Sequence, residues 1–414
     1  MSKPPSPFLP LAKPTLGVEE ERAVAEVLRS GWISQGPRVA LFEEELARLL
    51  GCRFVRAVNS GTSAITLALK ALGVGPGDSV VVPAFTCAAT ALPALTLGAH
   101  VVFADVDMAT FNLTWDSVDR VLQGNTKAVV LVHLFGRMAD AGGFAAKCRE
   151  RGIHLVEDAC LALGARRGGR AAGSVGAVGC HSFHPRKIIT TGEGGAVCTD
   201  DGAIAERVER DRNYGAGVSA WERFGKNLGQ LEGFSALGFN YKLTDIQAAV
   251  GLCQMARLPG FLSARRAIAA RYAERLAAVP AVRLPPAPAD SAEDVHQAIV
   301  CLWAPQEPEV LLGDWAALRG ALASRETLRS ELGARGIAFS DAAQFLPGLA
   351  VFGGSASNQE ALARAFPASY LAAKLSFALP IFPGMALDEV DTVCSAVGAA
   401  AKAALATQRP GGTA

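Results

Sequence analysis

The sequence lacks the features that mark membrane and nucleic-acid-binding proteins. Its 414 residues carry 40 lysines and arginines against 39 aspartates and glutamates, which gives a formal net charge of +1. No basic cluster with interleaved aromatics offers a surface for nucleic acid. No apolar run is long enough to span a bilayer, and the N-terminus has no stretch typical of a signal peptide. We therefore expect a cytoplasmic protein that binds neither nucleic acid nor membrane.

Cysteine and histidine are present without the spacing that binds metal. The nine cysteines are scattered and the six histidines show no ligand spacing, so no metal site is predicted. Most cysteines are expected to fill core positions in a reducing compartment. No P-loop and no nucleophile-elbow serine occur. The glycines at 73–77 follow a predicted helix instead of a strand, so they indicate a turn and not a dinucleotide-binding loop.

Short apolar runs alternate with helical patterns, which is typical of crossover units in a largely parallel sheet. A helix is predicted over 60–72, with Ser60 as its N-cap and Gly73 as its stop. The seven predicted strands are 53–58, 79–82, 100–104, 128–133, 154–157, 179–183 and 196–199. The fold class is therefore α/β.

The chain is too long for one small core, so a large and a smaller domain are expected. A pair of helices is predicted at 244–257 and 261–277, before a proline-rich stretch. The elements predicted beyond it are a strand at 295–303, a helix at 325–332, a strand at 337–339, a helix at 387–404 and a disordered tail at 408–414. We predict a large domain of residues 1–257 and a small C-terminal domain of residues 258–414.

One lysine stands in a segment otherwise suited to burial. Residues 182–195 read SFHPRKIITTGEGG, between two apolar runs that indicate buried strands. Lys187 is therefore expected near a strand end, inside the fold. Burial disfavours the ammonium form of a lysine, which leaves an amine able to attack a carbonyl and form a Schiff base. A solvated surface lysine is the alternative interpretation.

This segment resembles the lysine motif of the DegT/DnrJ/EryC1/StrS family of pyridoxal-phosphate-dependent sugar aminotransferases. The family pattern is Ser-Phe-(His or Tyr)-x-x-Lys followed by Thr-x-Gly-Glu-Gly-Gly, and every fixed position is present here. The resemblance runs from about residue 11 to about residue 397 and weakens beyond residue 280. It implies a fold-type I transferase, with a large domain on a mostly parallel seven-stranded sheet and a smaller C-terminal α+β domain.

Further segments match the family at positions that would hold pyridoxal 5′-phosphate. Residues 59–64 join a predicted strand to a helix, where backbone N–H groups and the helix dipole favour an anion. The resemblance implies that Gly61, Thr62 and Ser182 bind the phosphate, although a capped helix start would look similar. Asp158 ends a predicted strand, where the family places the partner of the pyridine nitrogen. A helix-capping carboxylate is the alternative there.

The resemblance also shows where this chain departs from its relatives. Cys87 aligns with a residue that is usually aromatic and stacks on the cofactor, and a thiol covers less of the ring. Leu161 and Leu163 stand where many relatives have a glutamine and a histidine, and Leu161 cannot hydrogen-bond the cofactor's phenolic oxygen. Gln344 lies in a stretch where relatives often show a histidine. These departures leave the substrate class open.

A last family signature covers residues 238–249 and contains Asn240. In relatives this asparagine reaches across the dimer to the phosphate in the neighbouring subunit. The resemblance therefore implies a homodimer with shared active sites, in which Asn240 binds the cofactor of the other subunit.

Together these residues predict an aminotransferase that uses pyridoxal 5′-phosphate. Lys187 would form the Schiff base and move the proton, while Asp158 keeps the pyridine nitrogen charged. The resemblance implies transfer from an amino acid, usually glutamate, to a nucleotide-linked keto-deoxysugar in deoxyaminosugar biosynthesis. A keto-cyclitol or another keto sugar is the alternative substrate, and a non-catalytic sensor or scaffold is the alternative function. A dehydratase branch carries histidine in place of the lysine, so Lys187 favours transamination.

Overall fold

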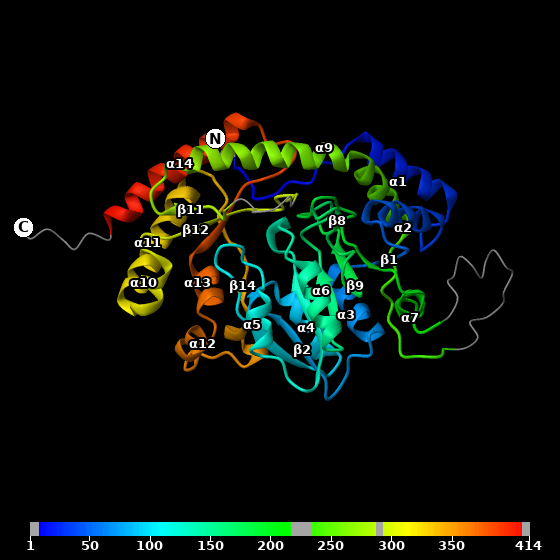
Figure 1. The fold of residues 1–414 in the computed structure, drawn as a ribbon. Coiled ribbons are helices and arrows are strands. Elements are labelled where there is room, and N and C mark those ends of the chain that lie inside the picture. The colour runs from blue at the N-terminus through cyan, green and yellow to red at the C-terminus, as the bar shows by residue number, and fades with distance from the viewer. Residues whose placement is uncertain (1–7, 217–233, 287–292, 408–414) are drawn as a thin grey trace, which may run out of the picture.

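A seven-stranded sheet forms the centre of the N-terminal half. The computed structural model describes residues 8–216, 234–286 and 293–407, and Figure 1 shows its fold. The sheet has the order β1-β10-β9-β6-β5-β2-β4. Its strands are β1 (Phe54–Val58), β2 (Ser79–Pro83), β4 (His100–Ala104), β5 (Thr126–Val132), β6 (His154–Asp158), β9 (Val178–Ser182) and β10 (Gly195–Thr199). Each lies close to its predicted range, which confirms the mostly parallel seven-stranded sheet.

Helices cover both faces of this sheet, so its strands are apolar on both sides. Val80 and Val82 pack in the cluster formed with α3 (Gly61–Ala71), α4 (Ala88–Thr96) and α7 (Gly202–Arg212). Val81, between them, packs in the cluster on the other face with α2 (Pro37–Leu50) and α6 (Ala141–Glu150). This alternation follows from the two-residue period of a strand.

Strand direction brings three of the predicted site segments to one edge. β6 and β9 pair in parallel, and β10 is antiparallel to both β9 and β1. β1, β6 and β9 therefore run in the same direction, and their carboxyl ends meet at one edge of the sheet. Asp158 is the last residue of β6, and the segments that follow β1 and β9 carry Gly61 and Lys187. Ligands gather at this edge in open α/β sheets.

Residues 245–276 form one helix, so the predicted pair of helices is wrong. α9 (Asp245–Leu276) is continuous through Pro259, although a proline lacks the N–H of a helical hydrogen bond. Packing outweighs this local cost, because α9 lies against α1 (Val18–Ser30) and α2 and, farther along, against α14 (Leu387–Ala406) (Figure 1). The domain boundary predicted between residues 257 and 258 falls within this helix, and the division into two domains stays a prediction.

The residues after α9 build a second sheet with its own core. β11 (Val282–Arg283), β12 (Ile299–Trp303), β15 (Ser376–Leu379) and β13 (Ser340–Asp341) follow one another in this four-stranded sheet, and all its pairs are antiparallel. α11 (Trp315–Ala334) and α14 pack in the same apolar cluster. The strand predicted at 337–339 is wrong, because Ile337 forms only an isolated bridge with Leu9. The predicted tail at 408–414 lies outside the described residues.

A two-stranded contact links the C-terminal half to the large sheet. β14 (Gln344–Phe345) pairs antiparallel with β3 (Phe85–Thr86), which comes just before α4. The remaining α-helices and strands are α5 (Trp115–Asp119), β7 (Arg166–Arg167), β8 (Arg170–Ala171), α10 (Pro308–Gly313), α12 (Gln359–Ala365) and α13 (Pro367–Leu375). In the part of the chain that the structure describes, no helix has the length and apolarity needed to cross a membrane.

Candidate active site

The turn between β1 and α3 packs closely against the carboxyl end of β9. The Ser60 hydroxyl accepts the N–H of Ser63 at 3.0 Å and so caps α3. Gly61 begins the helix and is buried. A Cβ at this position would lie 2.8 Å from Cβ of Ser182 and 2.9 Å from Sγ of Cys160. The structure therefore brings Gly61 and Ser182 together, and a residue larger than glycine does not fit between β9 and this helix end.

Thr62 and Lys187 are both more open than Gly61. Thr62 is exposed in the first turn of α3, and Lys187 lies half-buried in the connection between β9 and β10. Lys187 is thus more accessible than the sequence predicted. Burial and the Asp158 carboxylate raise the pKa of the Cys160 thiol well above its ordinary value, and the Lys187 ammonium opposes them. The lysine and the aspartate therefore act on the same thiol from nearby positions.

Asp158 ends β6 with a nearly buried carboxylate, which is 5 % exposed. Its Oδ2 accepts the Thr90 hydroxyl at 2.8 Å, and its Oδ1 accepts the backbone N–H of Cys160 at 3.2 Å. An ionised carboxylate has about four acceptor positions. Asp158 can therefore accept a further N–H from a ligand at the sheet edge.

Two threonines beside Asp158 were not singled out from the sequence. Thr86 in β3 and Thr90 in α4 are buried, and their hydroxyl oxygens are 3.2 Å apart. Their spacing of four residues is visible in the sequence, but only the fold places Thr90 against an aspartate far along the chain. The structure thus adds two hydroxyls to the predicted set.

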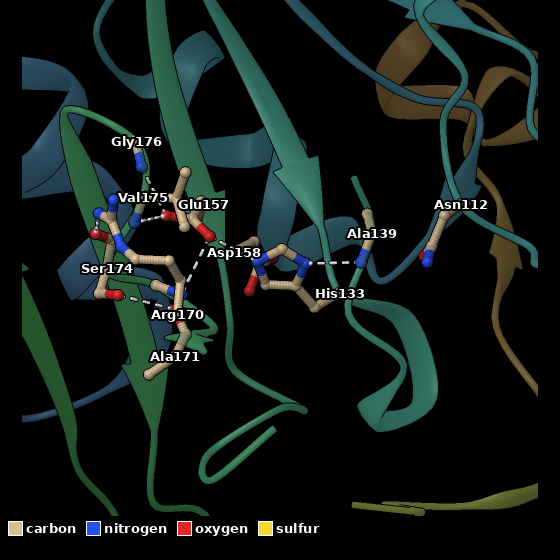
Figure 2. A network of polar contacts seen from close by, with 12 residues as sticks. Asn112, His133, Ala139, Glu157, Asp158, Arg170, Ala171, Ser174, Val175 and Gly176 are labelled. Atoms are coloured by element: carbon tan, nitrogen blue, oxygen red, sulfur yellow. Dashed lines mark hydrogen bonds and ion pairs between the residues drawn. The ribbon is translucent and has the colours of Figure 1, made fainter. Parts of the chain in front are cut away.

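Glu157 points to the opposite face from Asp158, as strand alternation predicts. Figure 2 shows it between His133 and the loop at 173–176. Its Oε2 accepts His133 Nε2–H at 2.8 Å and Gly173 N–H at 3.0 Å, and its Oε1 accepts two further backbone N–H groups, each at 2.6 Å. His133 Nδ1 accepts the N–H of Ala139, so its ring hydrogen is on Nε2.

This arrangement stabilises a buried charge. Burial alone would raise the pKa of Glu157, but the hydrogen bond from His133 and those from the backbone N–H groups lower it below its ordinary value. The carboxylate holds β6, the end of β5 and the loop together directly beside Asp158.

Asn240 lies beside the turn between β1 and α3 of its own chain, where the phosphate of the cofactor is predicted to bind. Its side chain is exposed, and its Oδ1 accepts Lys242 Nζ at 2.7 Å. Its backbone oxygen accepts Asn59 Nδ2 at 3.4 Å, and Asn59 directly precedes Ser60. The position is therefore next to the predicted cofactor site and open to a second molecule.

The departures from the family pattern fall in two environments. Leu161 and Leu163 pack against the apolar core of the large sheet. Cys87 is exposed at the start of α4, and Gln344 reaches the same helix end because its Oε1 accepts the N–H of Ala88 at 2.8 Å. Cys87 and Gln344 thus form one exposed rim at the N-terminal end of α4. Across the described ranges, no group of three or more histidines, cysteines and acids is placed to hold a metal ion.

Comparison with known proteins identifies the family. The sequence model of the DegT/DnrJ/EryC1/StrS aminotransferase family matches residues 14–398. The spore coat polysaccharide biosynthesis protein SpsC of Bacillus subtilis (strain 168) is 37% identical over 278 residues, which cover 67% of this chain and 72% of that protein. The chain belongs to the DegT/DnrJ/EryC1/StrS aminotransferase family.

Solved structures agree with this assignment. The aminotransferase TlmJ from Streptoalloteichus hindustanus is 32% identical with a TM-score of 0.83, over 96% of this chain and 99% of that one. DesV of S. venezuelae, solved with a ketimine intermediate, is 31% identical with a TM-score of 0.83 over the same shares, 96% and 99%. The protein is a fold-type I aminotransferase that uses pyridoxal 5′-phosphate, which sets aside the sensor or scaffold alternative.

Proposed function

We propose that this enzyme moves the amino group of glutamate to a nucleotide-linked keto-deoxysugar. The observation that carries the proposal is the meeting of Gly61, Ser182, Asp158 and Lys187 at one sheet edge, around the thiol of Cys160. The similarity to a polysaccharide biosynthesis protein supports a sugar as the acceptor. We also propose the cytoplasm as its location, which the nine free cysteines support.

The residues present fit pyridoxal 5′-phosphate. When bound, this cofactor supplies a ring that withdraws electrons from the donor's carbon. The absence of a side chain at Gly61 lets the start of α3 pack closely against Ser182, so the N-terminal N–H groups of α3 and the hydroxyls of Thr62 and Ser182 would hold the phosphate together. The Asp158 carboxylate would accept the N–H of the pyridine ring.

Lys187 would supply both a covalent anchor and a base. Its Nζ would hold the cofactor aldehyde and, when the amino donor displaces it, take up the proton from the donor's α-carbon. The half-buried position suits both roles, since the amine must be shielded from water and yet reach the substrate. Leu161 has no hydrogen-bond donor in its side chain, so the phenolic oxygen of the cofactor would need donors from other residues.

We further propose a homodimer in which Asn240 contributes to the neighbouring active site. The exposed side chain of Asn240, beside the turn between β1 and α3, supports this arrangement. Lys242, whose Nζ lies 3.9 Å from the centroid of the Tyr214 ring and bonds Asn240, would add positive charge for an anionic substrate.

A keto-cyclitol or another keto sugar is the second candidate acceptor. It is favoured by the shared rim of Cys87 and Gln344, because both positions differ from most relatives and lie together at the open end of α4.

Absorption spectroscopy of the purified protein tests the proposal. We expect pyridoxal 5′-phosphate to give a visible band that glutamate bleaches. The bleached enzyme is then offered a panel of nucleotide keto sugars and keto-cyclitols, and Lys187→Ala is used to trap the aminated product for mass spectrometry. Recovery of the band only with nucleotide keto sugars supports the first candidate, and recovery only with cyclitols supports the second. A band that glutamate leaves unchanged contradicts the donor assignment.

A further inference from the structure

Three polar side chains form a line that ends on the Asp158 carboxylate. Thr86 and Thr90 have hydroxyl oxygens 3.2 Å apart, and Thr90 Oγ1 is 2.8 Å from Asp158 Oδ2. A carboxylate accepts only, so Thr90 donates its single hydrogen to Asp158. Thr90 must then accept from Thr86. The direction of the whole line is thereby set by the charge at its end.

Burial makes these hydrogen bonds necessary, because Thr86 and Thr90 have no access to water. Thr86 and Thr90 are each 1 % exposed. Bulk water therefore cannot replace either partner, and a misplaced hydroxyl would be left without a hydrogen bond. The other carboxylate oxygen, Oδ1, accepts the Cys160 N–H at 3.2 Å, and the Cys160 side chain also hydrogen-bonds the carboxylate. The Thr90 hydroxyl is closer to the carboxylate than the Cys160 N–H is, and it therefore fixes the position of Oδ2.

The two threonines are held in place by the C-terminal half of the chain. β3 has only two residues, and β14 pairs with it so that Gln344 lies opposite Thr86. Gln344 Oε1 accepts the N–H of Ala88 at 2.8 Å, in the first turn of the helix that carries Thr90. The Leu346 N–H donates to the Ala84 oxygen at 2.9 Å on the other side of β3. The three contacts fix β3 and the start of α4 together.

We propose that Thr90, oriented by Thr86, is a positioning residue that holds the Asp158 carboxylate for the ring nitrogen of the cofactor. β14 keeps both threonines in register. This inference rests on the role of Asp158 in the proposed function and deepens it. Gln344 then influences the position of the Asp158 carboxylate through Thr86 and Thr90, and it also lies at the exposed rim beside Cys87.

Binding of two cofactors to the purified apoenzyme tests the inference. One is pyridoxal 5′-phosphate, and the other is its analogue with carbon in place of the ring nitrogen. We expect Thr90→Val to weaken binding of pyridoxal 5′-phosphate about tenfold, because one charge-assisted hydrogen bond to Asp158 is lost. Thr90→Ser, which keeps the hydroxyl, should stay within about threefold of the wild type. The analogue should bind Thr90→Val and wild type equally, since it makes no bond to Asp158.

Two controls separate positioning from general damage. Thr126→Val removes a buried hydroxyl at the start of β5, on the opposite edge of the sheet, and should bind both cofactors like the wild type. In an Asp158→Asn background, Thr90→Val should add less than about a twofold loss, because both changes remove the same interaction. If Thr90→Val does not fold, as judged by circular dichroism, Thr90→Ala takes its place in the same comparisons.

The outcomes are distinct for the two proposals. Equal binding of pyridoxal 5′-phosphate by Thr90→Val and wild type overturns the positioning role alone. An equal loss for both cofactors, or full additivity with Asp158→Asn, also overturns it, since the effect then does not pass through the ring nitrogen. If the wild type binds pyridoxal 5′-phosphate but glutamate leaves its visible band unchanged, the donor assignment falls while the positioning role stands on the binding data.

Discussion

Gly61 and Ser182 face each other across the end of the large sheet, so closely that a Cβ on Gly61 would lie 2.8 Å from Cβ of Ser182. We expect Gly61→Ala to weaken cofactor binding at least about tenfold, because overpacking forces the helix end away from β9. A titration with pyridoxal 5′-phosphate measures this. Gly75→Ala is the matched control, since a Cβ there meets nothing within 4 Å. Equal affinity of Gly61→Ala and wild type for the cofactor would show that the phosphate binds elsewhere.

Replacement of Lys187 should abolish turnover. We expect Lys187→Ala to lose at least about a hundredfold in rate, because the side chain is proposed both to hold the cofactor and to move the proton. The visible band of the lysine-bound cofactor should disappear as well. Lys147→Ala, a change on α6, should leave both readings unchanged. Undiminished turnover in Lys187→Ala would reject its assignment.

Co-expression of two inactive variants tests the shared active site. If Asn240 serves the neighbouring subunit, a dimer of one Lys187→Ala chain and one Asn240→Ala chain has one intact site and one that lacks both residues. Random pairing makes about half of the dimers mixed, so about a quarter of the wild-type activity should return. If Asn240 serves its own subunit, mixing restores nothing beyond the activity of the Asn240→Ala chain.

Burial of His181 should make the protein less stable in mild acid. Burial lowers the pKa of His181 to about 4, against about 6.5 in an unfolded chain. Between these values the unfolded state binds a proton that the folded state does not, so stability falls as the pH drops from about 6.5 to 4, by about 3 kcal/mol in total. Urea unfolding across this range should show that His181→Leu loses this part of the slope. His100→Gln, a change at an exposed site, should keep it. Identical slopes in His181→Leu and wild type would contradict the prediction.

Glu157 should matter for stability more than its position beside Asp158 suggests. In Glu157→Gln an amide NH₂ would face N–H donors that now bond a carboxylate oxygen. We expect a loss of about 1–3 kcal/mol in the free energy of unfolding, because the amide NH₂ leaves buried N–H donors without an acceptor. Urea unfolding at neutral pH measures it. Glu150→Gln, on the surface of α6, should change the free energy by less than about 0.5 kcal/mol. A similarly small effect at Glu157 would show that the loop at 173–176 is held by other contacts.

The sequence was most informative where local chemistry and position coincide. The seven strands were predicted because each is a short apolar run between turn signals, and Asp158 was placed at a strand end for the same reason. Ser60 was predicted as a helix cap because its hydroxyl acts on a neighbour three residues away. Such features depend on a few adjacent residues.

Predictions failed where a distant segment overrode the local signal. Two helices were predicted at 244–257 and 261–277, yet packing against α1, α2 and α14 keeps α9 continuous. Ile337 looked like part of a strand, but it pairs only with Leu9 at the other end of the chain. Neither outcome could be predicted from the neighbouring residues in the sequence, because the segments that decide it lie far away along the chain.

The sequence by itself determined the family and the cofactor of this protein, since the short motifs around Lys187, Asp158 and Gly61 resemble those of one aminotransferase family. Only the tertiary structure decided what surrounds them. Parallel strands brought the three motifs to one edge, and the pairing of β14 with β3 placed Thr90 against Asp158. Hydrogen bonds of this kind depend on distance and burial in space, and a linear sequence contains neither.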